Sequence, residues 1–168
     1  MDLRYQAVVL NDQVSSAIQV QSISWKRSIS GDPAATFYDF KIYMGYSNLD
    51  QLGMTFLDNY MPGTRTLVFS SSPYNINVGP NEWLTTTLNT PFWYSPAIGN
   101  LLIEVEWTSE SFGSVYMWHY NAGTDRAIKG AYGSPTAYAS ENTLPHIMLN
   151  GVLDLEPESF GSIKASFQ

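Results

Sequence analysis

The chain contains no cysteine. This absence excludes a thiol nucleophile, a thiolate metal site and a disulfide framework, but it does not decide the compartment, because secreted and cytosolic domains can both fold without disulfides. Basic residues are also few, since eight bases stand against fifteen acids for a formal net charge of -7. Nucleic acid and anionic membranes are therefore unexpected partners, because both are bound through clustered Lys and Arg.

Long apolar runs are missing as well. No stretch approaches the roughly 18 consecutive apolar residues that a membrane helix requires, so membrane insertion is not expected. Residues 1–4 lead directly into a polar-rich strand, without the basic and apolar regions of a signal peptide. We therefore expect either a cytosolic protein or a sequence that begins after a removed leader. Scarce Lys with abundant Ser, Thr, Asn, Gly and Tyr favours an extracellular or cell-surface location.

The chain does contain enough apolar residues to form a core. It has 168 residues, of which 44% are hydrophobic and 14% charged. A domain of about 150 residues hides roughly 70% of the surface that its unfolded chain exposes. No internal repeat, linker or low-complexity tract divides the sequence. We therefore expect one folded domain over residues 1–168.

Short runs of period-two alternation, bounded by Gly, Pro, Asn and Ser, indicate half-buried strands. In the run NLLIEVEW, Leu101, Ile103 and Val105 alternate with Glu104 and Glu106. We expect the apolar row to be buried and both carboxylates to lie on a solvated sheet face, with a well specified register. The other expected strands are 6–10, 17–25, 37–46, 66–69, 83–88, 114–120, 127–132, 146–155 and 162–167.

These elements define a fold class. About ten short strands with little helix predict an all-β, antiparallel, jelly-roll-like β-sandwich. A change of phase between Val20 and Ile23 predicts a bulge near residues 21–22. One helical turn is expected within residues 48–60, and residues 133–143 are expected to form a long loop.

Three stretches carry a resemblance to a known kind of domain. In chain order they are ISWKRSISGDPAATFYDFKIYMGYSN, TLVFS and NEWLTTTLNTPFWYSPAIGNLLIEVEW, which together cover roughly residues 20–107. They resemble a β-sandwich domain of secreted and cell-surface bacterial proteins, often found in chains with type IX-like C-terminal sorting domains. The resemblance implies an exported module with structural, adhesive or binding duties, and it carries no active-site residues across.

Aromatic residues provide the first candidate contact position. In the segment PFWY, Phe92 and Tyr94 share one strand face and Trp93 takes the other. Aromatic side chains directed inward fill the space between two sheets, and those directed outward can stack on sugar rings or on another protein. We expect Phe92 and Tyr94 in the core, and Trp93 is a candidate for contact with a partner.

A second aromatic row lies in residues 115–120. Tyr116, Trp118 and Tyr120 recur at every second position, about 6.6 Å apart along a strand. Two interpretations stay open at this point. The row is either an exposed platform for a polysaccharide or a subunit, or the buried row of the strand, with the alternate residues facing outward.

Catalytic and metal sites are weakly indicated. His119 and His146 are the only histidines, and neither has a motif that would supply a catalytic or zinc-binding partner. The pair Glu104 and Glu106 fits a solvated sheet face better than the carboxylate pair of a glycosidase. No cofactor is expected, although Asp32 or the acidic run 154–158 could bind calcium through oxygen ligands.

Three functional hypotheses follow from these residues. The first is a non-catalytic structural or adhesive module that binds other extracellular domains or itself, with residues 1–10 and 161–168 as candidate edges for pairing. The second is a carbohydrate-binding module that uses Trp93, Trp118 and neighbouring tyrosines. The third, a hydrolase, is the remotest, because the residues that it would need are nowhere grouped.

Overall fold

The computed structural model describes residues 2–111 and 114–153, apart from the side chains of residues 110 and 111. Within these residues the chain is almost entirely β-strand, with two short 3-10 turns, η1 (Asn11–Gln13) and η2 (Leu57–Asn59). No helix in this described part is long and apolar enough to cross a membrane. The predicted strand 162–167 and the acidic run 154–158 lie outside the described residues.

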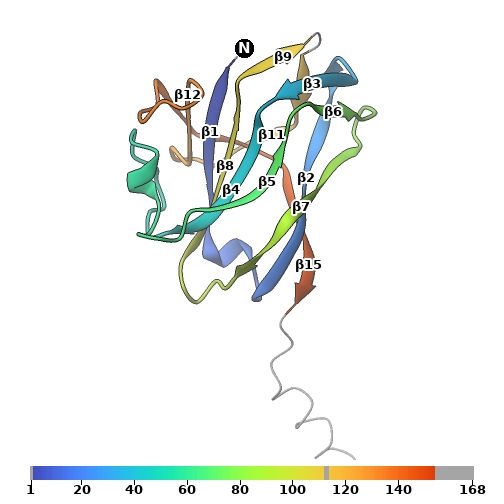
Figure 1. Cartoon of the computed structure of the whole chain (residues 1–168). Coiled ribbons are helices and arrows are strands. Elements are labelled where there is room, and N and C mark those ends of the chain that lie inside the picture. Colours follow the sequence, from blue (N-terminus) through green and yellow to red (C-terminus); the bar gives the residue numbers. More distant parts are fainter. Residues whose placement is uncertain (1, 112–113, 154–168) are drawn as a thin grey trace, which may run out of the picture.

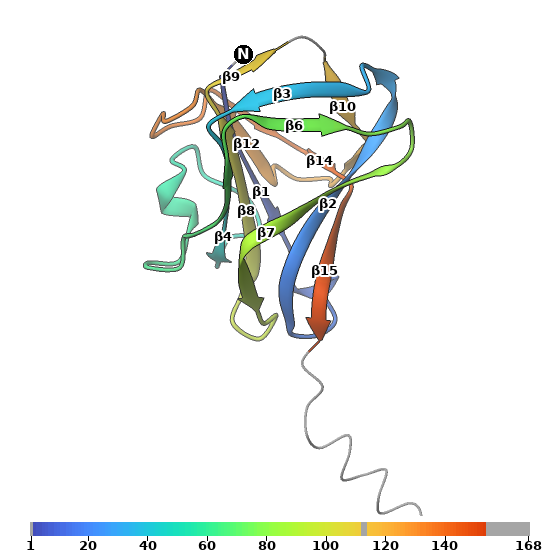
Figure 2. The same cartoon turned by 45° about the vertical axis from the view of Figure 1, so that its right-hand side comes forward.

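Two antiparallel sheets face each other and form a sandwich (Figures 1 and 2). The first sheet has the order β13-β12-β1-β8-β4-β5, and in the second β2 lies between β7 and β15, with β10 paired further along β2. The predicted all-β antiparallel sandwich is thus confirmed. The first sheet consists of β1 (Leu3–Val9), β4 (Phe40–Ser47), β5 (Thr66–Ser71), β8 (Asn100–Trp107), β12 (Ala127–Gly130) and β13 (Ala139–Glu141). The second consists of β2 (Ile18–Gly31), β7 (Trp83–Tyr94), β10 (Val115–Met117) and β15 (Ile147–Leu153).

Two smaller groups of strands complete the described fold. One sheet has the order β6-β3-β9 and lies across one end of the sandwich (Figure 2). The other is the pair β11-β14. Their bounds are β3 (Ala34–Tyr38), β6 (Tyr74–Asn77), β9 (Ser109–Ser111), β11 (His119–Asn121) and β14 (Thr143–Pro145).

The main core lies between the two large sheets, where alternate residues of facing strands meet. Phe92 and Tyr94 of β7 are buried there, as predicted, and Tyr94 stacks on Tyr46 of β4 with ring centroids 5.6 Å apart. Each large apolar side chain that is fully buried stabilises the fold by about 1.5–3 kcal/mol. The apolar row of β8 enters the same core and consists of Leu101, Ile103 and Val105.

The outer face of the first sheet is also covered. Residues 48–65 and 131–138, here called the covering segments, lie over it and are joined by backbone hydrogen bonds, such as that from the Phe56 N–H to the Pro135 carbonyl. Phe56 is fully buried there, in a second apolar cluster with residues such as Leu102 of β8. Strand β8 is therefore buried on both faces.

Several local predictions were wrong, and each for an identifiable reason. The one helical turn expected within residues 48–60 is present, but only as the three-residue 3-10 turn η2, because this segment is held by tertiary contacts to the sheet and not by helix periodicity. The predicted strand 114–120 is divided between β10 and β11, which pair with different strands. The predicted loop 133–143 includes β13. The bulge near residues 21–22 is confirmed by the register shift in the pairing of β2 with β7.

Buried tyrosines make the fold sensitive to alkali. Burial, with a smaller contribution from Tyr46, raises the pKa of Tyr94 from 10.0 to about 12, and burial also raises the pKa of Tyr74. The folded chain therefore keeps these protons after the unfolded chain has lost them, so their contribution to stability is complete below pH 10 and is lost as the pH rises toward 12.

We expect the free energy of unfolding, measured in urea, to decrease from pH 10 to pH 12. Tyrosinate absorbance followed on the same samples should show that ionisation accompanies unfolding. The Tyr94→Phe variant, which has no phenol to titrate at this position, should show a shallower decrease. A pH-independent stability across this range would contradict the prediction.

Candidate functional site

The most distinctive exposed surface is the outer face of the second sheet, formed by β7, β2 and β15 (Figure 2). We call it the indole face, because it includes three exposed tryptophans, Trp83, Trp93 and Trp118. Lys26 is the only charged side chain that the three strands direct to this face. The surface is therefore close to neutral, although the chain as a whole has a net charge of -7.

One end of the indole face is a cluster around Lys26. The backbone of Lys26 pairs with Trp83 on one side, and its carbonyl accepts a hydrogen bond from the Trp118 N–H on the other. The Lys26 ammonium lies 5.7 Å from the centre of the Trp83 ring, within the range of a cation–π contact. A cation thus lies in the same row as two indoles.

The indole of Trp118 is held in place by Asn81. Its Nε1 donates a hydrogen bond to the Asn81 Oδ1 at 2.8 Å, and Asn81 has a left-handed backbone with φ of 62°. Asn81 is one of the few residue types that adopt this conformation readily. Trp118 remains 38% exposed, so its ring is fixed and still accessible. Such preorganisation lowers the entropic cost of binding.

The middle of the face carries small uncharged hydrogen-bonding groups. The hydroxyls of Ser24 and Thr85 lie 2.8 Å apart on neighbouring strands, and the Asn150 side-chain amide donates to Ser24 at 3.1 Å. Met148 adds an exposed apolar contact opposite Ser24. Ser24 itself is buried, so Thr85 and Asn150 are the groups here that a ligand can reach, and both can donate and accept hydrogen bonds without a charge.

The other end is marked by Trp93, which is 46% exposed and pairs with Gln19 of β2. Because Trp83 pairs with Lys26, the two tryptophans of β7 are separated by the length of β2 from residue 19 to residue 26, roughly 23 Å. This span exceeds a single sugar ring or a small cofactor. A ligand that contacts both ends has to be an extended molecule.

The structure divides the aromatic row that the sequence suggested. Tyr116 and Trp118 are exposed, whereas Met117 between them packs against the core. Tyr120 does not continue the row, because β11 leaves β2 and pairs with β14, where Tyr120 faces His146 with ring centroids 5.5 Å apart. The four candidate residues are therefore placed at three locations, with Trp93 and Tyr120 each apart from Tyr116 and Trp118.

Tyr120 borders a groove at the open side of the sandwich. The groove has a volume of about 360 Å³ and lies between β1 and β15, with apolar walls that include Val9, Ile147 and Leu149. His146 is also on its rim, and His119 is exposed, with its Nδ1 2.8 Å from the Met117 carbonyl. Neither histidine lies beside a nucleophile or a carboxylate in the contacts of the described residues.

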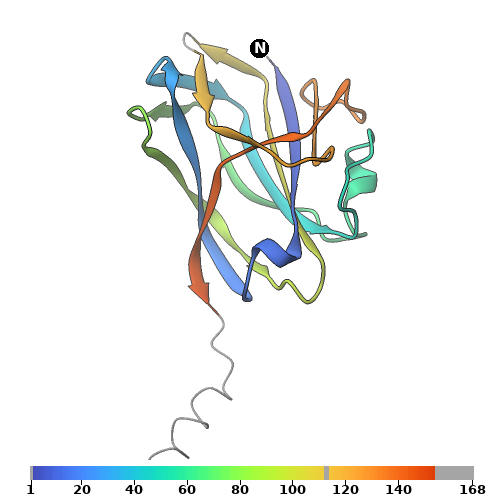
Figure 3. The ribbon, with the colours of Figure 1, turned by 180° about the vertical axis from the view of Figure 1, so that it is seen from behind.

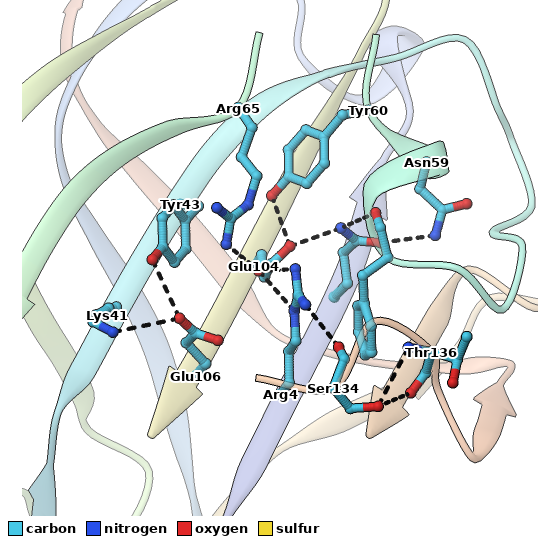
Figure 4. A network of polar contacts seen from close by, with 12 residues as sticks. Arg4, Lys41, Tyr43, Asn59, Tyr60, Arg65, Glu104, Glu106, Ser134 and Thr136 are labelled. Carbon is cyan, nitrogen blue, oxygen red and sulfur yellow. Dashed lines mark hydrogen bonds and ion pairs between the residues drawn. The ribbon is translucent and has the colours of Figure 1, made fainter. Parts of the chain in front are cut away.

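A second polar assembly lies on the other sheet, centred on Glu104 (Figure 4). Glu104 is completely buried, with 0% of its surface exposed. Its Oε1 accepts hydrogen bonds from Arg4 at 2.9 Å and from Arg65 at 2.7 Å. Its Oε2 accepts hydrogen bonds from the Gln6 amide at 3.0 Å and the Tyr60 hydroxyl at 3.1 Å. Burial and the Glu104 charge both raise the pKa of Tyr60, which keeps its phenol protonated as a donor.

The same network ties both covering segments to the sheet. The Asn59 amide donates to the Gln6 Oε1 at 2.8 Å, and Asn59 also exchanges two hydrogen bonds of 2.8 Å with the backbone of Gly53. Arg4 donates from its Nη1 to the Ser134 carbonyl at 2.7 Å. Four internal side chains donate to Glu104, and two of them, Tyr60 and Arg65, belong to a covering segment. The role of the assembly is therefore structural, since it anchors loops over the sheet.

The predicted solvated face for Glu104 and Glu106 is therefore wrong. The alternation along β8 is as expected, but the covering segments bury the opposite face as well, and Glu106 is only 5% exposed. Glu106 accepts a hydrogen bond from the Tyr43 hydroxyl at 3.2 Å and lies 3.7 Å from the Lys41 ammonium. A hydrogen bond with Tyr132 is the main cause that raises the pKa of Lys41. Both carboxylates thus have cationic partners.

No metal centre is present among the described residues, which contain no group of three or more His, Cys, Asp and Glu side chains placed to hold an ion. Asp32, the calcium candidate in this part of the chain, accepts a hydrogen bond from the Ser114 N–H at 2.9 Å. The other candidate, the acidic run 154–158, lies outside the described residues. Comparison with family models, curated proteins and solved structures found no match to this chain.

Sequence reasoning missed Trp83, Lys26 and Asn81 as members of the site. For Trp83 a signal was available, because the odd-numbered positions 83, 85, 87 and 93 of this strand alternate with the even-numbered positions that face the core. Applying the alternation from residue 83 to residue 94 would have placed Trp83 and Trp93 on one face. Lys26 and Asn81 join the site only through strand pairing and a turn, which local patterns do not supply.

Proposed function

We propose that this chain is a non-catalytic binding module of a secreted or cell-surface bacterial protein, and that it binds an extended polysaccharide through the indole face. The observation that carries the proposal is a nearly neutral sheet surface with two exposed tryptophans whose backbone positions lie about 23 Å apart along the strand, and with uncharged hydrogen-bonding groups between them. The domain resemblance in residues 20–107 supports the location. Export and adhesion are parts of the same proposal.

The chemistry of the face favours a sugar polymer over other extended ligands. Sugar rings present C–H groups that stack on the face of an indole, and hydroxyls that pair with side chains such as Thr85 and Asn150. A nucleic acid would require several cations, whereas this face has only Lys26. Strands hold these groups more rigidly than loops would, which suits binding without rearrangement.

The position of the carboxylates supports a non-catalytic role. Glycoside hydrolysis requires two carboxyl groups on either side of a substrate bond. Glu104 and Glu106 are buried beneath the covering segments and engaged by cations, on the opposite sheet from the indoles. They are not placed to act on a chain bound to the indole face.

The test is retention of the full chain on a panel of insoluble polysaccharides, followed by isothermal titration with soluble fragments of any polymer that binds. Trp118→Ala and Trp93→Ala should each reduce affinity roughly 30-fold, because truncating a binding hot spot costs about 2 kcal/mol or more. Thermal unfolding of each variant checks that the fold is intact.

Tyr138→Ala is the matched control. Tyr138 is 62% exposed, but it lies on a covering segment over the other sheet, so its loss should leave retention unchanged. Absence of binding across a broad panel, or equal losses in the tryptophan variants and in Tyr138→Ala, would contradict the proposal.

A further inference from the structure

The sandwich is incomplete along one side. Figure 3 shows β15 and β1 at the two borders of this side, on different sheets. Strand β12 pairs with β1 only from Arg4 to Ala7, so the end of β1 near Val9 has no neighbour from β12. The groove of about 360 Å³ described above occupies this region, and its walls include Val9, Val14 and Leu149. Four of the apolar side chains that line it are only partly buried, namely those of Val9, Val14, Ile147 and Leu149.

Strand β15 also has an open edge at this groove. It pairs with β2 from residue 147 to residue 153, and among the described residues no strand pairs with its other edge. An open edge presents unpaired N–H and C=O groups and is a template for another strand. An apolar groove beside a free strand edge is the combination that accepts an extended segment by β-augmentation.

We propose that the occupant is the chain's own residues 162–167, added antiparallel to the free edge of β15. The described chain ends at Leu153, the last residue of β15 and therefore at one end of this edge. Residues 154–161 would have to span the roughly 5 Å between neighbouring strands, and eight residues reach up to about 26 Å. The connection is long enough to reverse the chain, and antiparallel strands can be joined by short loops.

The sequence of residues 162–167 fits a strand with one face on the apolar groove and the other face in solvent. In SIKASF, Ile163, Ala165 and Phe167 alternate with polar residues, so one strand face would be apolar. This apolar face would lie over the groove walls, beside Ile147 and Leu149. The polar face, with Lys164, would continue the outer side of the sheet. A lysine on an edge strand discourages further pairing, which suits the final strand of a sheet.

The proposal does not rest on polysaccharide binding, because it concerns the edge of β15 that faces away from β2 and β7. It can be tested by cross-linking, since the chain has no cysteine of its own. Leu149→Cys is combined in turn with Ile163→Cys, Ala165→Cys and Phe167→Cys in the full chain. At least one pair should form a disulfide within a monomer under mild oxidation, resolved on a non-reducing gel and mapped by mass spectrometry.

Leu149→Cys with Lys164→Cys is the control, because Lys164 would face away from the groove, and it should give at least tenfold less of the cross-linked monomer. Disulfide-linked dimers in place of monomers would overturn the assignment to the same chain and indicate a second copy as the occupant. Equal cross-linking at residues 163 to 167, or none, would overturn the proposed docking itself.

Hydrogen exchange supplies a second measurement that does not depend on disulfide geometry. Amides of β15 at the free edge should be protected in the full chain and should exchange at least tenfold faster in Phe167→Asp, with Ser166→Asp as the matched control. If the two variants exchange alike, or if β15 is unprotected in the full chain, the groove is not filled by this segment. Neither result decides whether Trp93 and Trp118 bind a polysaccharide, which the retention assay tests separately.

Discussion

Replacing Glu104 with alanine is expected to lower the free energy of unfolding by about 3–5 kcal/mol, because it removes one partner of a buried ion pair and leaves the other uncompensated. Arg4 is buried, and its Nε and Nη2 lie 2.9 and 2.8 Å from the Oε1 of this carboxylate. Arg65, Gln6 and Tyr60 would lose their acceptor as well. Equilibrium unfolding in urea measures the loss.

Glu104→Gln separates charge from shape, since it keeps the size of the side chain while removing its charge. We expect it to retain part of the stability but to remain well below the native chain, because both guanidinium groups stay without a counter-ion. Glu141→Gln is the matched control, since Glu141 pairs with Lys129 at a partly exposed position. An exposed pair contributes at most about 1 kcal/mol. A Glu104→Ala loss no larger than that of Glu141→Gln would show that the network is not an anchor.

The same strand shows how far sequence reasoning reaches. The period-two pattern of β8 correctly predicted that Leu101, Ile103 and Val105 face the core, because alternation is a property of extended backbone and is visible locally. It did not reveal that residues 48–65 and 131–138 would cover the other face. That coverage arises from contacts distant in sequence, such as the hydrogen bond from the Tyr60 hydroxyl to Glu104, which no local pattern encodes.

The candidate site was predictable to a similar degree. Outward exposure of Trp93 follows from its place between Phe92 and Tyr94, which point to the core, and the structure agrees. The row from Tyr116 to Tyr120 could not be judged from spacing, because the strand ends at Met117 and the chain then pairs with a different partner. The alternation of side chains predicts which of them face outward within one strand, but not beyond the point where the chain pairs with a different strand.

Tyr94→Ala is expected to destabilise the chain by about 3–5 kcal/mol, the range observed when a large buried aromatic residue is truncated. Tyr94 is fully buried between the sheets, stacks on Tyr46, and donates a hydrogen bond from its hydroxyl to the Gly99 carbonyl at 2.9 Å. Removing its ring leaves a cavity at the seam of the two sheets. Urea unfolding measures the effect, and Tyr94→Phe, which removes only the hydroxyl, should cost about 1 kcal/mol.

Trp93→Ala is the control for Tyr94→Ala, because the comparison shows which side chains of β7 face the core. Trp93 precedes Tyr94 in the same strand but points to the other side of the sheet, so its truncation should change the free energy of unfolding by no more than about 0.5 kcal/mol. In the polysaccharide assay the order should reverse, because Trp93→Ala removes a proposed contact while native-like Tyr94→Phe removes none. Comparable destabilisation by Trp93→Ala and Tyr94→Ala would mean that the two faces of β7 do not divide into a dry core and an exposed surface.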